Sequence, residues 1–233
     1  MKKIVITGNI GSGKSKVTEI LKNLGYKTAS ADEISAKILE DNHQKITKMF
    51  SMPPQKFETF KKRLGKMVFG EQDEYPYNFK EQLEDFMLPK IQEKIQNLYE
   101  NDPEIIIEMP TFFETKGTSL SHQEEYFIIH VYASQEVRIS RIKSRNPDLT
   151  EQDIKDRIGS QIHFIKKMDY SQFNIENNGS EEDLIQKVKD LTLVIRDIFE
   201  DDKQMKCRNC GSTNFAWCHN DDYCQDCGSR DVW

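Results

Sequence analysis

Short apolar runs alternate with segments of helical periodicity along most of the chain. The apolar runs predict β-strands at residues 3–7, 26–29, 104–109, 126–132 and 172–176. Apolar residues recur every three or four positions in other segments, which predicts helices at residues 14–24, 32–41, 137–144, 151–168 and 181–199. Strands that alternate with helices in this way predict an α/β fold with a five-stranded parallel sheet.

The segment of about residues 43–101 interrupts this alternation. It contains Pro53 and Pro54, and its apolar residues recur at helical intervals, for example at Leu64, Met67, Leu83 and Ile91. This pattern predicts a helical insertion between the second and third strands. A charged run at residues 200–206 predicts a linker that follows a main domain of residues 1–199.

Composition limits the compartment and the partners. The 233 residues can bury one α/β core and leave room for a small accessory module. No apolar run approaches the ~20 residues that span a bilayer, and Ile4–Ile6 is too short for a signal sequence, so we expect a cytoplasmic protein. The net charge of -6 disfavours binding to nucleic acid or to anionic membranes.

A glycine-rich loop between the first strand and the first helix carries the clearest chemical signal. Residues 8–15 match the phosphate-binding pattern GxxxxGK[S/T] in its expected strand–loop–helix context. Glycines let backbone N–H groups converge on phosphate oxygens, the lysine reaches the β- and γ-phosphates, and the final serine can ligate Mg²⁺. The loop alone fits a GTPase or a motor ATPase as well as a kinase. The expected ATP-binding residues are Gly8, Gly11, Ser12, Gly13, Lys14 and Ser15, with Ser15 also the magnesium ligand.

Two acidic residues end predicted strands and should face the same edge of the sheet as this loop. Asp32 follows the second strand and is a candidate base for the acceptor, although aspartate is also a favoured helix N-cap. Glu108 ends the third strand and can reach a magnesium-bound water, or it is a plain strand-end carboxylate. Phosphoryl transfer requires a group that orients or deprotonates the acceptor beside a metal-held donor.

Arginines after the fourth strand are spaced for one helical face. Arg138, Arg141 and Arg145 stand at i, i+3 and i+7, and Arg157 can join them from the next helix. We expect them to close over the triphosphate as a lid of about residues 138–168. A solvated basic face is the alternative interpretation.

Together these residues resemble the dephospho-CoA kinase family over about residues 1–195. The likeness rests on residues 6–15, 24–25, 31–32, 64–65 and 68–69, on Pro110, Phe113, Glu114, Arg141, Arg145, Leu149, Thr150, Gln161 and Lys167, and on residues 175–180. The resemblance implies a P-loop kinase three-layer sandwich, in which the helical insertion covers the acceptor. It also implies transfer of the ATP γ-phosphate to the ribose 3′-hydroxyl of dephospho-CoA.

The resemblance assigns roles to individual residues. Asp32 would be the general base, Arg141 the lid arginine on the ATP phosphates, and Lys14 the third catalytic residue. Arg145 would join the nucleotide-binding residues, and the loop from Asn177 to Gly179 would lie beside the adenine. The candidate acceptor-binding residues are Asp32, Lys61, Glu108 and Pro110.

The sequence departs from the family pattern mainly where the acceptor should bind. The family's His-Pro pair is Leu88-Pro89, an expected arginine is Lys61, the first acid of an Asp-Ala-Asp triplet is Ser30, and an Ala-Asp pair is Ser171-Gln172. Two alternatives to dephospho-CoA phosphorylation therefore remain. The acceptor of the kinase is a (deoxy)nucleoside monophosphate, or the protein is a non-catalytic regulator that binds ATP. An ATPase stimulated by nucleic acid conflicts with the acidic charge.

All five cysteines lie in the last 27 residues. Cys207, Cys210, Cys224 and Cys227 form two CxxC pairs separated by 13 residues, with a glycine after each pair, which predicts a zinc ribbon over residues 207–233. Structural Zn²⁺ held by four thiolates would supply most of the folding energy of such a short module. Cys218 and His219 either do not bind the ion or replace one of the four ligands. The alternative to a zinc site is that the cysteines form disulfides.

The predicted ribbon is acidic. Two arginines against four aspartates give it a net charge of -2, which disfavours contact with a phosphate backbone. A protein contact, a contact between copies of the chain, or a cap over the acceptor site is favoured instead.

Overall fold

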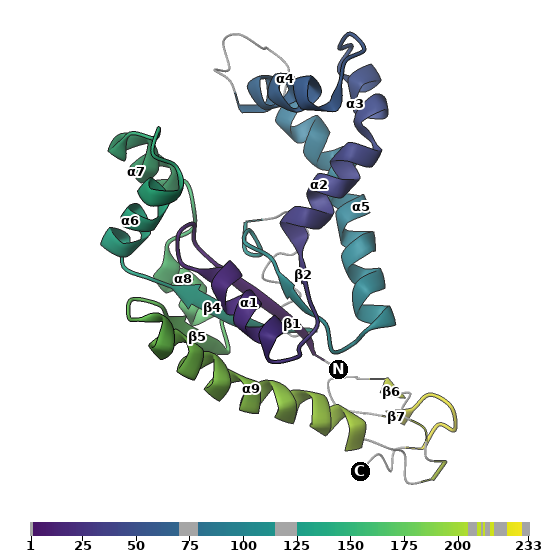
Figure 1. Cartoon of the computed structure of the whole chain (residues 1–233). Helices are drawn as coiled ribbons and strands as arrows, with labels where there is room; N and C mark the ends of the chain where they lie inside the picture. Colours follow the sequence, from purple (N-terminus) through teal and green to yellow (C-terminus); the bar gives the residue numbers. More distant parts are fainter. Residues whose placement is uncertain are drawn as a thin grey trace.

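The computed structural model describes residues 2–69, 79–114 and 125–204, together with residues 209, 210, 212, 215, 216 and 223–229 near the C-terminus (Figure 1). The helices of the described residues are α1 (Lys14–Asn23), α2 (Ala31–Asp41), α3 (His43–Met49), α4 (Phe57–Phe69), α5 (Phe79–Asn101), α6 (Gln135–Arg145), α7 (Glu151–Gly159), α8 (Phe164–Asp169) and α9 (Glu181–Gln204).

A five-stranded parallel sheet lies at the centre of the molecule, as predicted. Its strands are β1 (Lys3–Gly8), β2 (Thr28–Ser30), β3 (Ile106–Glu108), β4 (Tyr126–Tyr132) and β5 (Phe173–Glu176), in the order β2-β3-β1-β4-β5. Ser30, Ile6 and Glu108 lie level with one another in this register. The ends of β1, β2 and β3 therefore meet at the edge where open parallel sheets bind ligands.

Helices cover both faces of the sheet. Alternate residues of β1 enter opposite layers, as the two-residue repeat of a strand requires. Ile4 and Ile6 pack with apolar residues of α1 and α9, whereas Val5 packs with Tyr99 of α5. The Tyr99 hydroxyl also donates a 2.8 Å hydrogen bond to the Ile4 carbonyl. This is the three-layer arrangement that the resemblance implied.

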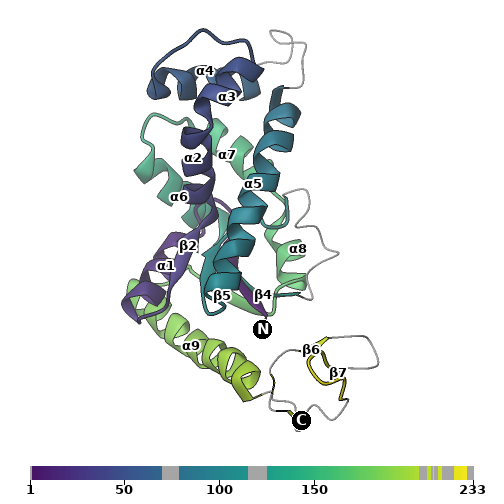
Figure 2. The same cartoon turned by 90° about the vertical axis from the view of Figure 1, so that its right-hand side faces the viewer.

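The helical insertion forms an apolar cluster of its own above the sheet edge (Figure 1). Ile46 of α3, Phe60 of α4 and Met87 of α5 are buried in it, and Ile38 of α2 packs against it. Helices α2 and α5 lie side by side in both views and lead down to the sheet (Figure 2). The insertion is thus positioned to wall one side of a site at the strand ends.

The single helix predicted over residues 151–168 is wrong, because the chain breaks between α7 and α8. Thr150 and Asp153 form a capping box at the start of α7, and the His163 side chain caps α8 by accepting from the Ile165 N–H. The connection contains Gln161, whose side chain contacts the phosphate loop. Tertiary contact with that loop overrides the helical periodicity.

The helix predicted to end at residue 199 continues to Gln204, so residues 200–204 of the predicted linker are helical. Arg196 forms an i,i+4 ion pair with Glu200 across the expected boundary. Beyond α9, β6 (Phe215–Ala216) pairs antiparallel with β7 (Tyr223–Cys224). Within the described ranges, we find no helix with the length and apolar character needed to cross a membrane.

The insertion cluster should be a separable contribution to stability. Phe60→Ala removes a fully buried ring and should lower the free energy of unfolding by roughly 3–5 kcal/mol, while nucleotide binding at the distant phosphate loop persists. Met49→Ala, at a residue that is 39% exposed, is the control and should change it by less than about 0.5 kcal/mol. Denaturant unfolding measures both, and equal effects would contradict this account of the cluster.

Candidate active site

The loop between β1 and α1 has the backbone of a phosphate-binding loop. Gly11 and Gly13 have φ angles of 78° and 95°, in the left-handed region that glycine adopts without strain. A side chain at Gly11 would meet the backbone of Arg138, and one at Gly13 would meet the Asn177 side chain. These glycines let the loop turn tightly against its neighbours, so that α1 begins at Lys14 with its N-terminal N–H groups beside the site.

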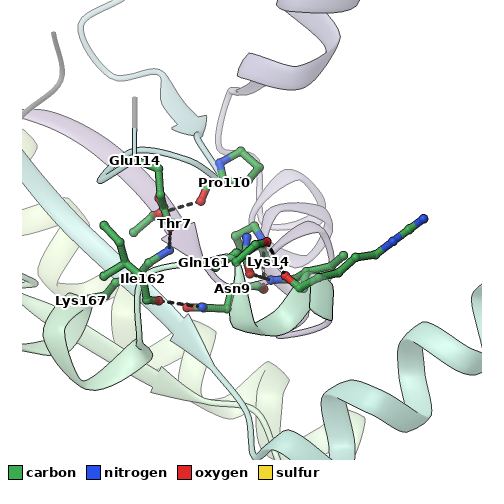
Figure 3. A network of polar contacts seen from close by, with 11 residues as sticks. Thr7, Asn9, Lys14, Pro110, Glu114, Gln161, Ile162 and Lys167 are labelled. Atoms are coloured by element: carbon green, nitrogen blue, oxygen red, sulfur yellow. Dashed lines mark hydrogen bonds and ion pairs between the residues drawn. The ribbon is translucent and has the colours of Figure 1, made fainter. Parts of the chain in front are cut away.

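Side chains from distant elements hold this loop (Figure 3). Arg138 Nε donates a 2.9 Å hydrogen bond to the Ile10 carbonyl, and the Ile10 N–H donates to Gln161 Oε1 at 2.8 Å. Asn9 Nδ2 donates to the Ile162 carbonyl at 2.9 Å. The non-helical segment between α7 and α8, which contains Gln161 and Ile162, therefore helps to hold the phosphate loop.

Arg141 and Asn177, both predicted at the nucleotide, meet on the same loop. Asn177 Nδ2 donates a 2.8 Å hydrogen bond to the Ser12 carbonyl, and Arg141 Nη2 donates to Asn177 Oδ1 at 3.3 Å. Arg141 Nη1 lies 3.4 Å from the Ser12 carbonyl oxygen. Gly179 follows in the turn that connects β5 to α9, two residues beyond Asn177.

The spaced arginines are not one exposed row. Arg138 is 5% exposed and supports the loop from below, Arg141 is half-buried, and Arg145 is exposed at the end of α6. Arg157 is exposed on α7. Arg138 lies in the first turn of α6, next to the end of β4. Its side chain therefore packs against the side of the loop that faces the protein and does not cover the phosphate site.

Lys14 is buried at the centre of the site, where it is 8% exposed. Its ammonium group donates a 3.2 Å hydrogen bond to the Asn9 carbonyl. Burial lowers the pKa of Lys14 from 10.5 to about 8, and the charge of Glu108 opposes this shift while that of Lys167 adds to it. The site thus holds a desolvated cation that bound phosphate would stabilise.

Glu108 connects β3 to the start of α1. Its Oε1 accepts a 3.1 Å hydrogen bond from the Ser15 hydroxyl, and its Oε2 accepts one of 3.3 Å from the Thr18 hydroxyl. Thr18 lies one helical turn after Lys14, on the same face, and was not predicted as a site residue. Ser15, Glu108 and Asp32 line a hollow of about 240 Å³ on this side of the loop.

Asp32 lies where this hollow meets a larger cleft. Ser30 caps α2, so Asp32 occupies the first turn and is not the N-cap. Asp32 also lines a cleft of about 710 Å³ between α2 and α5. The other lining residues are Ala31, Ser35, Lys80, Glu84, Leu88, Ile91, Gln92, Ile95, Met109, Thr111, Phe112 and Glu114.

The structure does not bring every predicted acceptor residue to this cleft. Lys61 lies on α4, where it pairs with Glu58 at 3.0 Å, and it is absent from the cleft lining. Pro110 lies in the turn after β3, and its carbonyl accepts a 3.4 Å hydrogen bond from the Thr7 hydroxyl. Leu88 was expected near the acceptor, whereas the other cleft-lining side chains of α5, from Lys80 to Ile95, were not predicted as site residues, although their spacing of three or four residues marks one helical face.

The donors around the loop fit a polyphosphate. Within the described residues, the buried Ser12 Oγ and Arg138 Nη2 have no hydrogen-bond partner in the protein. Buried polar atoms of this kind are costly unless a ligand or water satisfies them. The hydroxyl of Ser15 and the carboxylates of Glu108 and Asp32 add the hard oxygen atoms that Mg²⁺ prefers.

Cysteines gather in the C-terminal segment. The sulfur atoms of Cys210, Cys224 and Cys227 lie within 4.8 Å of one another, and Asn209 Nδ2 donates to Cys227 Sγ at 3.6 Å. The Gly228 N–H donates a 2.8 Å hydrogen bond to the Cys224 carbonyl in the turn after β7. Cys207, Cys218 and His219 lie outside the described residues.

The strand order, the phosphate loop and its supporting arginines define a P-loop kinase, a class of phosphotransferase. Comparison with known proteins narrows the class. The family model described as dephospho-CoA kinase matches residues 3–183. The chain belongs to the dephospho-CoA kinase family.

Individual relatives agree with this assignment. A dephospho-CoA kinase of Helicobacter pylori is 32% identical over 191 residues, which cover 80% of this chain and 93% of the relative. One of Campylobacter jejuni is 33% identical over 187 residues, covering 78% and 90%. The solved structure of a dephospho-CoA kinase from Campylobacter jejuni has a TM-score of 0.62 at 31% identity, covering 87% of this chain and 100% of that chain. TT1252 from Thermus thermophilus has a TM-score of 0.70 at 26% identity, covering 83% and 96%.

The lowered pKa of Lys14 predicts that ATP binding depends on pH. Below about 8 Lys14 is already protonated, whereas at higher pH the protein must take up a proton to bind phosphate. The affinity for MgATP should therefore fall about tenfold between pH 7 and pH 9, and calorimetry in buffers of different ionisation enthalpy should detect proton uptake at pH 9. Lys16→Met, at a half-buried neighbour of Lys14 on α1, should keep this dependence, and a flat profile in the wild type would contradict it.

Proposed function

We propose that this protein transfers the γ-phosphate of ATP to the ribose 3′-hydroxyl of dephospho-CoA. The observation that carries the proposal is the position of Asp32, in the wall shared by the hollow beside the phosphate loop and the cleft between α2 and α5. A carboxylate at this boundary can contact an acceptor hydroxyl from the cleft while ATP lies on the loop.

Contacts of Lys14, Arg141 and Asn177 at the phosphate loop support the proposed nucleotide roles. The residues that bind ATP in this proposal are Gly8, Gly11, Ser12, Gly13, Lys14, Ser15, Arg141, Arg145, Asn177 and Gly179. Ser15 and Glu108 would hold Mg²⁺, directly or through water, and the bound ion would neutralise charge on the phosphates. Arg141 and Lys14 would contact the transferred phosphoryl group, because both side chains lie at the phosphate loop.

The Asp32 carboxylate has the role of general base. It accepts the proton of the acceptor hydroxyl, the hydroxyl oxygen forms a bond to the γ-phosphorus, and the bond from that phosphorus to the bridging oxygen breaks as ADP leaves. The side chains of Lys14 and Arg141 stabilise the negative charge on the oxygens of the transferred group.

The charge of the cleft favours a hydroxyl acceptor over a nucleoside monophosphate. Among the lining residues that the structure describes, Asp32, Glu84 and Glu114 are acidic and Lys80 is basic. Lys80 lies 3.9 Å from Glu84, and Glu114 lies 2.6 Å from Lys167, so these charges are largely balanced and Asp32 is the carboxylate that decides the charge met by an acceptor. A phosphate brought next to Asp32 would meet like charge, whereas a hydroxyl would meet a hydrogen-bond acceptor.

Substitution of Asp32 tests this function. Asp32→Asn keeps the shape but removes the base, so kcat with dephospho-CoA should fall roughly 10²–10⁴-fold. Asp41→Asn, at the exposed end of the same helix, is the matched control and should leave kcat unchanged. ATP consumption is measured with Mg²⁺ against dephospho-CoA and a panel of (deoxy)nucleoside monophosphates. Turnover with a monophosphate instead would reassign the acceptor, and absence of turnover with every acceptor would favour a regulatory role.

The cysteine cluster supports a second proposal. We infer that Cys210, Cys224 and Cys227 bind structural Zn²⁺, with Cys207 as the fourth ligand. Three sulfur atoms within 4.8 Å of one another can ligate one ion, and Cys224 lies on β7 of the antiparallel β6–β7 pair. A module this short gains most of its folding energy from such an ion. The family model matches residues 3–183, and the cysteines lie beyond them, which supports the proposal that the module is an addition to the kinase domain.

Metal analysis tests the zinc proposal without reference to activity. The purified protein should contain one Zn²⁺ per chain, and Cys210→Ser should lose it, because three thiolates hold zinc more weakly than four. Cys218→Ser should retain zinc, and loss of the metal in that variant would make Cys218 a ligand. Thiol titration after unfolding separates the disulfide alternative, in which reductant increases the count. ATP binding should survive in every variant.

A further inference from the structure

A buried ion pair joins two parts of the site that are distant in the sequence. Lys167 Nζ lies 2.6 Å from Glu114 Oε1, and the Lys167 side chain has 0% exposure (Figure 3). An ammonium group removed from water is strongly destabilising unless it is paired. Neither the binding of ATP nor the deprotonation of the acceptor, as described above, uses this pair.

Lys167 belongs to the support of the phosphate loop. It lies on α8, directly after the connection in which Gln161 and Ile162 hold Ile10 and Asn9. Its charge is also close enough to lower the pKa of Lys14. Any displacement of α8 would therefore reach the loop through two hydrogen bonds.

Glu114 belongs to the wall of the acceptor cleft. It lies at the end of the turn that follows β3, and it lines the cleft together with Asp32 and Phe112. The same turn is linked to β1 by the hydrogen bond from the Thr7 hydroxyl to the Pro110 carbonyl, which is longer, at 3.4 Å. The ion pair thus connects the acceptor wall to the supports of the phosphate loop.

We propose that Glu114 and Lys167 are positioning residues, whose ion pair fixes the acceptor wall of residues 109–114 relative to the phosphate loop. The proposal rests on the function proposed above, because its consequence is alignment of the acceptor hydroxyl with the γ-phosphate. In-line transfer depends steeply on this alignment, and a displacement of about 1 Å costs on the order of 100-fold in rate.

A double-mutant cycle tests the pair in the full chain. Glu114→Gln and Lys167→Met each leave one buried charge unpaired and should lower the melting temperature, whereas the double variant removes both charges and should recover it. In all three variants kcat/KM for dephospho-CoA should fall on the order of 100-fold, because each breaks the same contact. The dissociation constant of a fluorescent ADP analogue should change far less than kcat/KM, since Arg138, Arg141 and Asn177 still hold the loop directly.

A second ion pair, whose lysine is exposed, provides the control for loss of an ion pair outside the site. Lys27 and Asp102 also lie 2.6 Å apart, at the amino ends of β2 and β3, away from the site. The Lys27→Met, Asp102→Asn double variant should keep wild-type kinetics. Recovery of kcat/KM together with the melting temperature in the Glu114→Gln, Lys167→Met variant would overturn the positioning role and leave the proposed function intact. A wild-type rate in Lys167→Met alone would also overturn it, since Glu114 would then act without its partner. Absence of acceptor-dependent turnover in the wild type would overturn the function and, with it, this inference.

Discussion

The site depends on one constraint: the backbone N–H groups of the phosphate loop must remain available to phosphate, so the carbonyl groups of the same loop need other partners. Buried carbonyl groups without partners are strongly disfavoured. Side chains supply those partners here, with Lys14 on the Asn9 carbonyl, Arg138 on that of Ile10, and Arg141 and Asn177 on that of Ser12. All four donors are cationic or amide groups, and they come from three separate parts of the chain. The loop is therefore assembled only when β5, α6 and the sheet are in place.

The same constraint explains how a protein of net charge -6 holds several cations around one loop. Lys14, Arg138 and Lys167 repel one another, and burial removes the solvent that would screen them. Glu108 and Glu114 offset this repulsion from β3 and the turn after it, and both carboxylates also face the substrate sites. The positive potential is local, which suits a small polyphosphate and conflicts with a long polyanion.

The sequence was most informative where one short pattern determines both geometry and chemistry. The glycine-rich loop, the parallel sheet and the helical insertion follow from spacing and periodicity, and the structure and family assignment confirm the fold. The helix predicted through Gln161 was wrong, because apolar periodicity cannot show that the helix ends there and that the Gln161 side chain accepts a hydrogen bond from the Ile10 N–H. Likewise, the i, i+3, i+7 spacing put Arg138 among the lid arginines. The structure shows that Arg138 is buried against the phosphate loop, and this depends on how α6 packs there, which the spacing cannot show. Lys61 was named from its position in a motif, and only the folded insertion shows it paired with Glu58.

The departures from the family pattern are not equivalent once they are placed in the fold. Gln172 precedes β5 and accepts a 2.7 Å hydrogen bond from the Ile128 N–H, away from the strand ends that form the site. Ser30 caps α2 and so orients Asp32 without replacing it. Leu88, in contrast, lines the acceptor cleft itself. Since Leu88 lies beside Ile91 and Ile95 on one face of α5, it extends an apolar wall where a histidine would have offered a polar contact. Any change in acceptor recognition relative to the family should therefore originate at this wall, because the residues proposed to bind ATP and to deprotonate the acceptor match the family pattern.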